Sequence, residues 1–419
     1  DFPPYNSMGS QRPFAWFKYF HEFGLYPVVV TRQWSDTFKN AVDYVKPGDV
    51  TESVETITEK GTIIKVPYNP NLRDKILLKY GLNKFVSLRR LLSLFYEVFQ
   101  YIHFCFDAKK EIYNAADEYI KKHKVDYIIA TGNPFILFKY AHLLSTKYSV
   151  PWIADYRDYW SLDYKYFPNS YTIIERFFLR FLFLMLEKKY IASASHITTV
   201  SELPKTKLQE LFPSNKVDVI LNGYFEENYV ALSNKNIKTQ NFEIAFGGTI
   251  YPFHPLELFM KGLEKFIIDN NRKDIRINFY GCAFDVNQQN RILKNASSIT
   301  EYVIITDRIP RDELFENFFK SSCLLIFENN NMISGKFLEY LPLNRPILMA
   351  GNDKGPLEFI IKETHSGFVG DSVSEIVKIL ENLYHEWKSN GFVAGNTVNH
   401  EKYSRRNQTS KLSEAILSI

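Results

Sequence analysis

Ser334-Gly335-Lys336-Phe337-Leu338-Glu339-Tyr340-Leu341 is the stretch that decides the fold of this chain. An apolar run at residues 323–327 precedes it, and a second apolar run at residues 346–350 follows it. Short apolar runs bounded by turn residues indicate buried strands. The small residues Ser334 and Gly335 then open a short helix between the two strands. Strand, helix and strand in this order predict a βαβ unit on a parallel sheet.

The start of this predicted helix carries charges that suit a phosphorylated ligand. Lys336 lies in the first turn, where Ser334 and Gly335 present backbone N–H groups at the positive end of the helix dipole. Glu339 follows among apolar neighbours, and a carboxylate in such surroundings needs donors, which a ribose diol provides. A nucleotide diphosphate is therefore the first ligand to consider. In the alternative interpretation, Lys336 and Glu339 are ordinary solvated residues of a surface helix.

Composition narrows the class of protein. The 419 residues are enough for two domains, and a net charge of +4 argues against a dedicated nucleic-acid binder. The three cysteines share no metal-like spacing, so we expect buried thiols in a reducing cytosol. No basic or apolar leader opens the chain, and the apolar run 177–186 is shorter than the roughly 20 residues that cross a bilayer. We expect a cytoplasmic protein, with the inner face of the cytoplasmic membrane as a further location.

Strand-like and helix-like segments alternate along the whole chain, which indicates parallel sheets. Nine segments read as strands: 27–31, 126–130, 151–154, 196–200, 242–246, 276–280, 302–306, 322–327 and 346–350. Helical periodicity is clearest in the segments 88–106, 171–192 and 404–419. The polar segment 222–241 lacks periodicity and marks a domain boundary.

We therefore expect an α/β protein with two Rossmann-like, doubly wound domains that face each other across a cleft. The expected ranges are 1–225 for the first domain and 240–400 for the second, with residues 401–419 as a terminal helix that crosses back to the first domain. The loop 3–10 should follow a first strand, of which Asp1 and Phe2 remain, so we expect that strand to be largely missing.

Several loops, taken in order, resemble glycosyltransferase family 4 and its relatives. The resemblance spans nearly the whole chain, and six segments carry it: the glycine loop 3–10, the loop 131–135, the Asp-x-Arg-Asp-x-Trp block 155–160, the strand 194–201, the glycine turn 246–249, and Lys336 with Glu339. The resemblance implies the two-Rossmann-domain (GT-B) fold. It also implies transfer of a sugar from a nucleotide donor with retention of configuration and without a required metal or cofactor. Many bacterial relatives build surface polysaccharides.

This chain departs from the family pattern at several positions. Asn331 stands where many members carry the first of two glutamates. Thr249 and His254 stand where many carry an arginine and a lysine that clamp the diphosphate. Arg157 stands where some members have a catalytic histidine. Because the clamp is altered, Lys336 must balance more of the negative charge of the diphosphate.

The resemblance assigns residues to both halves of a site. The nucleotide sugar is expected at the second domain, on Gly247, Gly248, Thr249, His254, Ser334, Gly335, Lys336 and Glu339. The acceptor and part of the sugar are expected at the first domain, on Gly9, Ser10 and Asn133, with Arg157, Asp158 and Lys336 as catalytic candidates. Gly9 and Ser10 are equally compatible with a plain strand-to-helix turn. For Gly247 and Gly248 the functional interpretation is favoured, because loops at a switch point line the cleft. Arg157 with Asp158 is equally compatible with a local ion pair.

For two predicted helices, the sequence does not decide what their apolar faces contact. The segments 88–106 and 177–186 each present an apolar face, which suits a membrane surface with a lipid-linked acceptor or packing against the sheet. Packing is the favoured interpretation for both.

The first functional hypothesis is a retaining glycosyltransferase that uses a nucleotide-diphosphate sugar and a glycan or lipid-linked acceptor. An epimerase of nucleotide sugars on the same fold is the second, and a partner protein that has lost activity is the third.

Overall fold

The computed structural model describes residues 1–5, 8–38, 42–161, 173–229, 237–328 and 332–419. The chain forms two compact units, each described below by itself. The first comprises Asp1–Leu221 and Gln408–Ile419, and the second comprises Asn222–Asn407. The ranges expected from the sequence, 1–225, 240–400 and 401–419, stay a prediction about domain boundaries.

Strands of the first unit form two sheets, each with open edges. One sheet has the order β1-β3-β2, in which β1 and β3 are parallel and β2 is antiparallel. The other has the order β4-β5-β6-β7 and is parallel throughout. The strands are β1 (Val28–Arg32), β2 (Val54–Thr58), β3 (Gly61–Val66), β4 (Ile128–Gly132), β5 (Trp152–Tyr156), β6 (His196–Thr199) and β7 (Val217–Val219).

Helices cover both faces of these sheets, as parallel strands require. They are α1 (Met8–Tyr19), α2 (Leu72–Tyr80), α3 (Val86–Phe99), α4 (Lys110–Lys122), α5 (Ile136–Tyr148), α6 (Ile173–Ile191) and α7 (Glu202–Leu211). Trp152 and Phe138, both fully buried, lie in the main core of this unit. The C-terminal helix α14 (Arg405–Leu417) adds Leu412 and Ile416 to a second core cluster.

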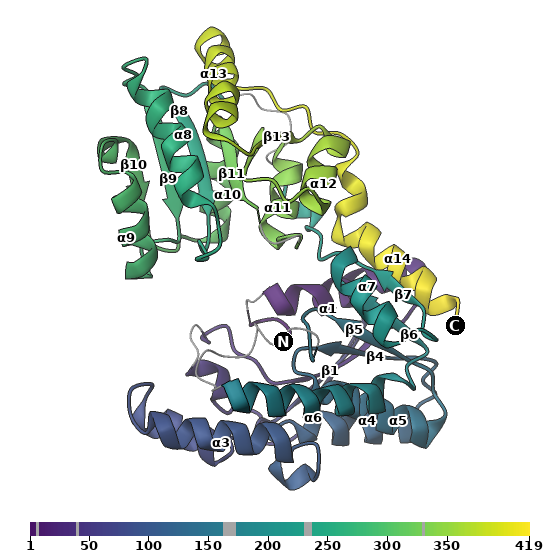
Figure 1. Cartoon of the computed structure of the whole chain (residues 1–419). Coiled ribbons are helices and arrows are strands. Elements are labelled where there is room, and N and C mark those ends of the chain that lie inside the picture. Colours follow the sequence, from purple (N-terminus) through teal and green to yellow (C-terminus); the bar gives the residue numbers. More distant parts are fainter. Residues whose placement is uncertain (6–7, 39–41, 162–172, 230–236, 329–331) are drawn as a thin grey trace. The chain divides into compact units, whose positions relative to one another are not determined.

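The second unit is one parallel sheet of six strands with the order β10-β9-β8-β11-β12-β13 (Figure 1). The strands are β8 (Phe242–Gly247), β9 (Ile275–Tyr280), β10 (Val303–Ile305), β11 (Cys323–Phe327), β12 (Ile347–Ala350) and β13 (Gly367–Gly370). The helices are α8 (Leu256–Ile268), α9 (Val286–Asn295), α10 (Arg311–Lys320), α11 (Gly335–Tyr340), α12 (Pro356–Thr364) and α13 (Val373–Asn390). Chain order runs outward from β8 to β10, returns to β11 on the other side of β8, and continues outward. This is the doubly wound order of a Rossmann fold.

The sequence-based strands are confirmed to within two residues at each end, and the hairpin β2–β3, β7 and β13 were not predicted. One expectation about cysteines is wrong: Cys282 and Cys323 are buried, but Cys105 is exposed.

Candidate functional site

The second unit brings the predicted nucleotide residues together where its strand order reverses. β8 pairs with β9 on one side and with β11 on the other. The loops after β8 and β11 therefore leave the sheet in opposite directions at the carboxyl ends of the strands, which is the place where ligands bind in open α/β sheets. Gly247 is the last residue of β8, Gly248 and Thr249 follow it, and the segment Ser334–Glu339 follows β11. Asn331 lies outside the described residues.

Lys336 reaches from α11 to the turn after β8. Its Nζ donates to the carbonyl oxygen of Thr249 at 3.2 Å and lies 5.0 Å from the centroid of the Phe246 ring. Gly248 has φ +99°, and a Cβ at this position would lie 2.6 Å from the Lys336 Nζ. Glycine at position 248 therefore serves both the turn and the close approach of the amine.

Burial changes the acidity of this amine. Loss of solvent lowers the pKa of Lys336 to about 8, against the opposing effects of Cys282 and Glu339. The Cys282 thiol, whose pKa burial raises to about 12, donates to the Gly248 carbonyl at 3.1 Å. An anion beside Lys336 would favour its charged form. This amine is therefore suited to a negatively charged ligand.

Glu339 has a protein partner that the sequence did not indicate. Arg311, the first residue of α10, donates from Nη2 to the Glu339 Oε1 at 2.8 Å. Burial raises the pKa of Glu339, while Arg311 and Arg405 act in the opposite direction. The sequence carries no signal for this pair, because the two residues lie on different helices. Ribose recognition by Glu339 stays a prediction, and Arg311 joins the residues beside it.

Side-chain contacts fix α11 against the end of β8. The Gly247 N–H donates to the Tyr340 hydroxyl at 3.1 Å, and the Ser334 hydroxyl accepts from the Phe337 N–H at 3.2 Å as the N-cap. Tyr340 was not predicted as a site residue. Because α11 spans only Gly335–Tyr340, its dipole is small, and the Lys336 side chain adds a positive charge beside Gly248.

His254 lies in the same loop and is buried among aromatic rings. Its Nδ1 accepts from the Tyr251 N–H at 3.2 Å, and its ring stacks on Phe327 with centroids 5.4 Å apart. With Nδ1 accepting, a neutral His254 carries its proton on Nε2. A hydrogen bond from His254 to a diphosphate stays a prediction.

In the first unit, Arg157 ties two predicted loops together. Its guanidinium donates to three backbone carbonyls: Gly9 at 2.6 Å, Gly132 at 3.3 Å, and Asn133. Burial lowers the pKa of Arg157, with Asp155 acting in the opposite direction. Gly9 and Ser10 lie in the first turn of α1 instead of in a loop. These contacts make Arg157 a residue that positions Gly9 and Asn133.

The two aspartates of the 155–160 block have different surroundings. Asp155 is fully buried and accepts from Nε and Nη2 of Arg12 at 3.0 and 2.6 Å, and from the hydroxyls of Thr131 and Thr198. Burial raises the pKa of Asp158, against the effect of Arg157. Arg157 and Asp158 each shift the pKa of the other electrostatically, and their interpretation as a local ion pair stays a prediction. Arg12 was missed because its partner lies 143 residues away.

Both predicted packing helices of the first unit expose apolar faces. On α6, Ile174 (81% exposed), Phe177 (76%), Phe181 (61%) and Met185 (54%) recur at helical spacing. On and after α3, the exposed members are Leu88, Leu91, Phe99 and Ile102. We call these exposed residues of α6 and of α3 together the apolar face. The expectation that both helices bury their apolar residues is wrong for this face, although Leu179 and Phe183 on the opposite side of α6 are buried.

Neither a metal-binding cluster nor a membrane-spanning helix is present among the described residues. No group of three or more histidines, cysteines, aspartates or glutamates is arranged to hold a metal ion. Among the described helices, none has the length and apolar character to cross a membrane.

No protein-family model and no curated protein sequence matches this chain. Solved structures do match. A glycosyltransferase from Rickettsia africae ESF-5 has a TM-score of 0.59 at 13% identity, over 99% of this chain and 96% of its own. Trehalose-6-phosphate synthase OtsA has a TM-score of 0.61 at 10% identity, over 100% and 97%. Anabaena HepE in complex with UDP and glucose has a TM-score of 0.54 at 10% identity, over 94% and 100%.

These neighbours are glycosyltransferases with the GT-B fold, and this chain has that fold. At identities this low the likeness establishes the fold alone. Membership of family 4 stays a prediction.

Proposed function

We propose that this protein is a retaining, family 4-like glycosyltransferase that takes a sugar from a nucleoside diphosphate. The observation that carries the proposal is the turn after β8 in the second unit, where the partly buried Lys336 amine meets Gly248 at the switch point of a Rossmann sheet. The HepE structures hold UDP, UDP with glucose, and UDP-glucose, which supports a nucleotide sugar as the donor class. No metal or organic cofactor is part of the proposal.

Lys336 would stabilise the departing diphosphate. When the bond from the anomeric carbon to the phosphate oxygen breaks, negative charge gathers on that oxygen. A fixed cation in a site with little water lowers the energy of this state. The acceptor hydroxyl forms the new bond on the same face of the sugar, and its proton passes to the departing phosphate. Glu339, held by Arg311, would accept from the ribose hydroxyls.

The first unit would supply the acceptor side of the reaction. Arg157 positions the backbone at Gly9 and Asn133 through its three carbonyl contacts. Asp158 follows it at the carboxyl end of β5, where it would orient a sugar hydroxyl. Ser10 would contribute from the first turn of α1. In this assignment Arg157 is a positioning residue, and Asp158 is the candidate that touches substrate.

Nucleotide binding tests the donor half. We expect uridine, guanosine, cytidine or thymidine diphosphate to raise the Tm of the protein in a thermal-shift series, and Lys336→Met to abolish that shift. Lys261→Met is the matched control, because Lys261 is an exposed lysine of the same unit on α8. Equal shifts in both variants would contradict the role of Lys336, and the absence of a shift with every nucleotide would favour the inactive partner protein.

Product analysis tests the reaction itself. Incubation of the donor sugar with an acceptor should release nucleoside diphosphate and form a glycoside of unchanged anomeric configuration, as read by NMR coupling constants. An epimerase would instead convert the donor without any acceptor. An inverted product would overturn the retaining assignment and leave the donor site intact.

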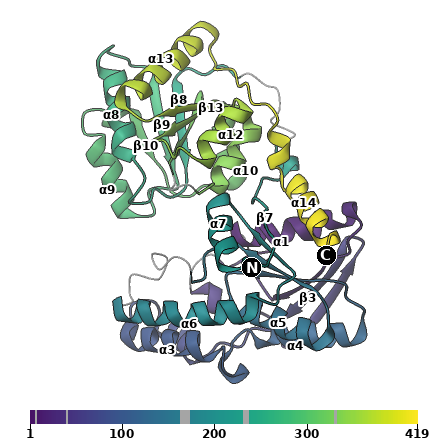
Figure 2. The same cartoon turned by 45° about the vertical axis from the view of Figure 1, so that its right-hand side comes forward.

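The apolar face favours a lipid-linked acceptor presented at a membrane surface, in polysaccharide biosynthesis. Figures 1 and 2 both show α3 and α6 lying alongside one another. Exposed cations lie on α6 or just before α3, namely Arg180, Lys188, Lys189 and Lys84, while the acidic residues of the two helices are Glu97, Glu175 and the buried Glu187. An apolar face with a basic border suits an anionic lipid surface, with about 1 kcal/mol from each cation near the headgroups.

Vesicle flotation tests this surface. We expect the protein to float with vesicles that contain phosphatidylglycerol, less with pure phosphatidylcholine, and less at high salt. The double variant Phe177→Ser/Phe181→Ser should stay in the lower fraction. Ile57→Ser is the matched control, because Ile57 is 72% exposed on β2 of the same unit and belongs to neither helix. A change of mass on sedimentation, with no lipid binding, would assign the face to a second copy of the chain instead.

A further inference from the structure

Helix α6 buries one stripe of side chains on the side opposite to its exposed apolar residues. Leu179, Phe183 and Glu187 recur at every fourth position, so they lie on one side of the helix, and all three are buried. The first two belong to the main core of the first unit. Glu187 is the acidic member of this buried stripe, and an acidic side chain in such surroundings needs hydrogen-bond donors.

The donors come from both ends of the segment 156–161. The Tyr156 hydroxyl donates to the Glu187 Oε1 at 2.8 Å, and the Ser161 N–H donates to the Glu187 Oε2 at 3.2 Å. The Ser161 hydroxyl donates to the same Oε2. Tyr156 is the last residue of β5, so one carboxylate joins the end of this strand to the residue five positions later. Joining both ends reduces the conformations that the residues between them can adopt.

This segment carries two residues of the proposed acceptor side. The Arg157 guanidinium is bound to backbone carbonyls, as described above. Trp160 is 4% exposed and stacks on Phe135, with ring centroids 5.2 Å apart and 5° between the ring planes. The Asp158 side chain, by contrast, reaches solvent. The contacts of the segment therefore fix the residues on both sides of Asp158 and leave its carboxylate facing outward.

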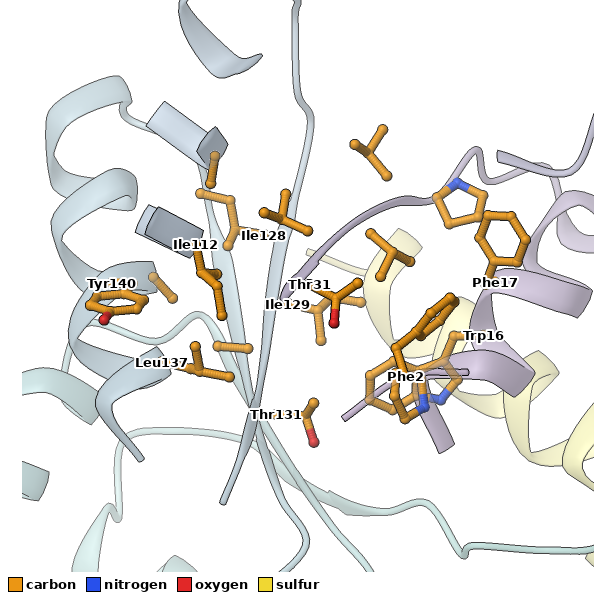
Figure 3. A pocket seen from close by; sticks show the side chains of 18 of the residues that line it. Phe2, Trp16, Phe17, Thr31, Ile112, Ile128, Ile129, Thr131, Leu137 and Tyr140 are labelled. Carbon is orange, nitrogen blue, oxygen red and sulfur yellow. The ribbon is translucent and has the colours of Figure 1, made fainter. Parts of the chain in front are cut away.

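The start of the segment has a second anchor, in the sheet. Asp155 accepts from the hydroxyls of Thr131 in β4 and Thr198 in β6, each at 2.7 Å. Thr131 is one of the β4 residues that line a cavity of the first unit, which Figure 3 shows. These bonds hold the carboxyl end of β5 between its two neighbouring strands. The far end of the segment, at Ser161, is held by Glu187.

Glu187 is a costly residue for a purely structural role. Burial raises its pKa to about 7, although the bonds from Ser161 and Tyr156 act in the opposite direction. Apolar side chains of similar volume often replace buried charged groups with no loss of stability. What the carboxylate adds is therefore the connection between the two ends of the segment.

We propose that Glu187 is a positioning residue of the acceptor side: by binding Tyr156 and Ser161, it holds the segment 156–161 so that Asp158 faces an acceptor hydroxyl. This role rests on the proposed function, in which Asp158 orients that hydroxyl. Glu187 itself touches no substrate, because its side chain is fully buried. Since Glu187 belongs to α6, the helix that carries part of the apolar face also sets the acceptor side.

Substitutions at two positions of the buried stripe test this role. Glu187→Met keeps a similar volume and offers no carboxylate to either end of the segment. Glu187→Gln keeps an acceptor oxygen for Ser161, while its amide group can donate to the Tyr156 hydroxyl. Leu179→Ala is the matched control, because it loosens the core beside the same helix without removing a hydrogen bond.

Hydrogen exchange of the amides of residues 157–160, followed by mass spectrometry, measures the order of the segment. We expect this exchange to become about tenfold faster in Glu187→Met and to change by less than about threefold in Glu187→Gln and Leu179→Ala, although Leu179→Ala lowers the Tm. Equal acceleration in Glu187→Met and Leu179→Ala would overturn the proposal, since exchange would then follow the stability of the core. Unchanged exchange in Glu187→Met would overturn it as well.

Ser161→Ala approaches the same contact from the segment. It removes the hydroxyl that donates to Glu187 and should speed exchange of residues 157–160 by about threefold or more. No change in this variant would overturn the proposal even if Glu187→Met does not fold.

Kinetics separate positioning of the acceptor from donor binding. With UDP-glucose as the donor probe and octyl glucoside as the acceptor probe, Glu187→Met should raise the KM for octyl glucoside by about tenfold or more and leave the KM for UDP-glucose unchanged. Glu187→Gln should have a KM for octyl glucoside close to that of the wild type. An unchanged KM for octyl glucoside in Glu187→Met, or an equal rise in both KM values, would overturn the proposal. If the wild-type protein transfers no glucose, the proposed function fails for these probes, whereas the exchange of residues 157–160 still decides whether Glu187 holds the segment.

Discussion

At the scale of single residues, Lys336 is the group whose chemistry depends most on its surroundings. Its amine has a pKa lowered to about 8, chiefly by burial, so the free protein loses this charge as the pH rises through 8. A diphosphate binds the charged form. We expect the affinity for the nucleoside diphosphate to fall by about tenfold between pH 7 and pH 9. Titration calorimetry at three pH values measures this change.

The Lys336→Met variant controls for other titrating groups. It should bind more weakly than the wild type at pH 7 and show a flat pH profile. A variant profile as steep as that of the wild type would assign the pH dependence to another residue.

A second prediction about pH concerns the protonation of Glu187. It is fully buried, and burial raises its pKa from 4.5 to about 7, against the effects of its bonds to Ser161 and Tyr156. The native state therefore holds the proton more tightly than the unfolded chain does. The contribution of this group to stability is complete below pH 4.5 and is lost as the pH rises through 7. We expect a loss of roughly 2–3 kcal/mol over this range in urea unfolding.

Glu187→Gln should flatten this dependence, since the amide does not titrate. Glu210→Gln is the matched control, because Glu210 is exposed on α7 of the same unit. Its pH dependence should equal that of the wild type, and a flattened profile in this control would contradict the assignment to Glu187.

At the scale of elements, the turn after β8 depends on Gly248. Alanine there would meet a backbone with φ +99° and would place its Cβ 2.5 Å from the Lys336 Cε. We expect Gly248→Ala to displace the lysine, to lower nucleotide affinity at least tenfold, and to cost about 1 kcal/mol or more in stability. Calorimetry and thermal unfolding measure the two effects.

Gly81→Ala separates backbone strain from displacement of Lys336. Gly81 has φ +76°, but a Cβ there has no neighbour within 4 Å. This control should lose stability and keep its nucleotide affinity. An equal loss of affinity in both variants would show that strain alone explains the effect of Gly248→Ala.

The helices and strands also show how much of the fold could be predicted from sequence patterns. Apolar runs predicted nine strands because buried parallel strands are continuous in apolar residues. They missed β2, whose five residues are all exposed, and β13, which has a glycine at each end. Periodicity predicted α6 but could not tell which partner its apolar face contacts. The order of the loops along the chain predicted that Lys336 and Gly248 belong to one site. Arg311 and Arg12 were missed because their carboxylate partners lie far away in sequence.

At the scale of the whole molecule, the chain passes between its two units twice. It leaves the first unit after Leu221 and returns at Gln408, within α14. The Gln408 side chain accepts from the Leu221 N–H at 2.8 Å, so the exit and the return are joined by a hydrogen bond. The first unit therefore depends on residues that come after the whole second unit in the chain.

Leu412 links α14 to the core of the first unit, since it is fully buried in one cluster with Trp16, Phe20, Ile153 and Ile220. Leu412→Ala should lower the free energy of unfolding of the first unit by about 2–5 kcal/mol, through lost burial and a cavity. Lys411→Ala, at an exposed neighbouring position, should change this free energy by less than about 0.5 kcal/mol.

Hydrogen exchange distinguishes the units, because Ile153 in β5 should exchange faster in Leu412→Ala while Ile244 in β8 does not change. Faster exchange at both positions would show that the C-terminal helix stabilises the two cores together, and no change at Ile153 would show that the first unit holds its core without this helix.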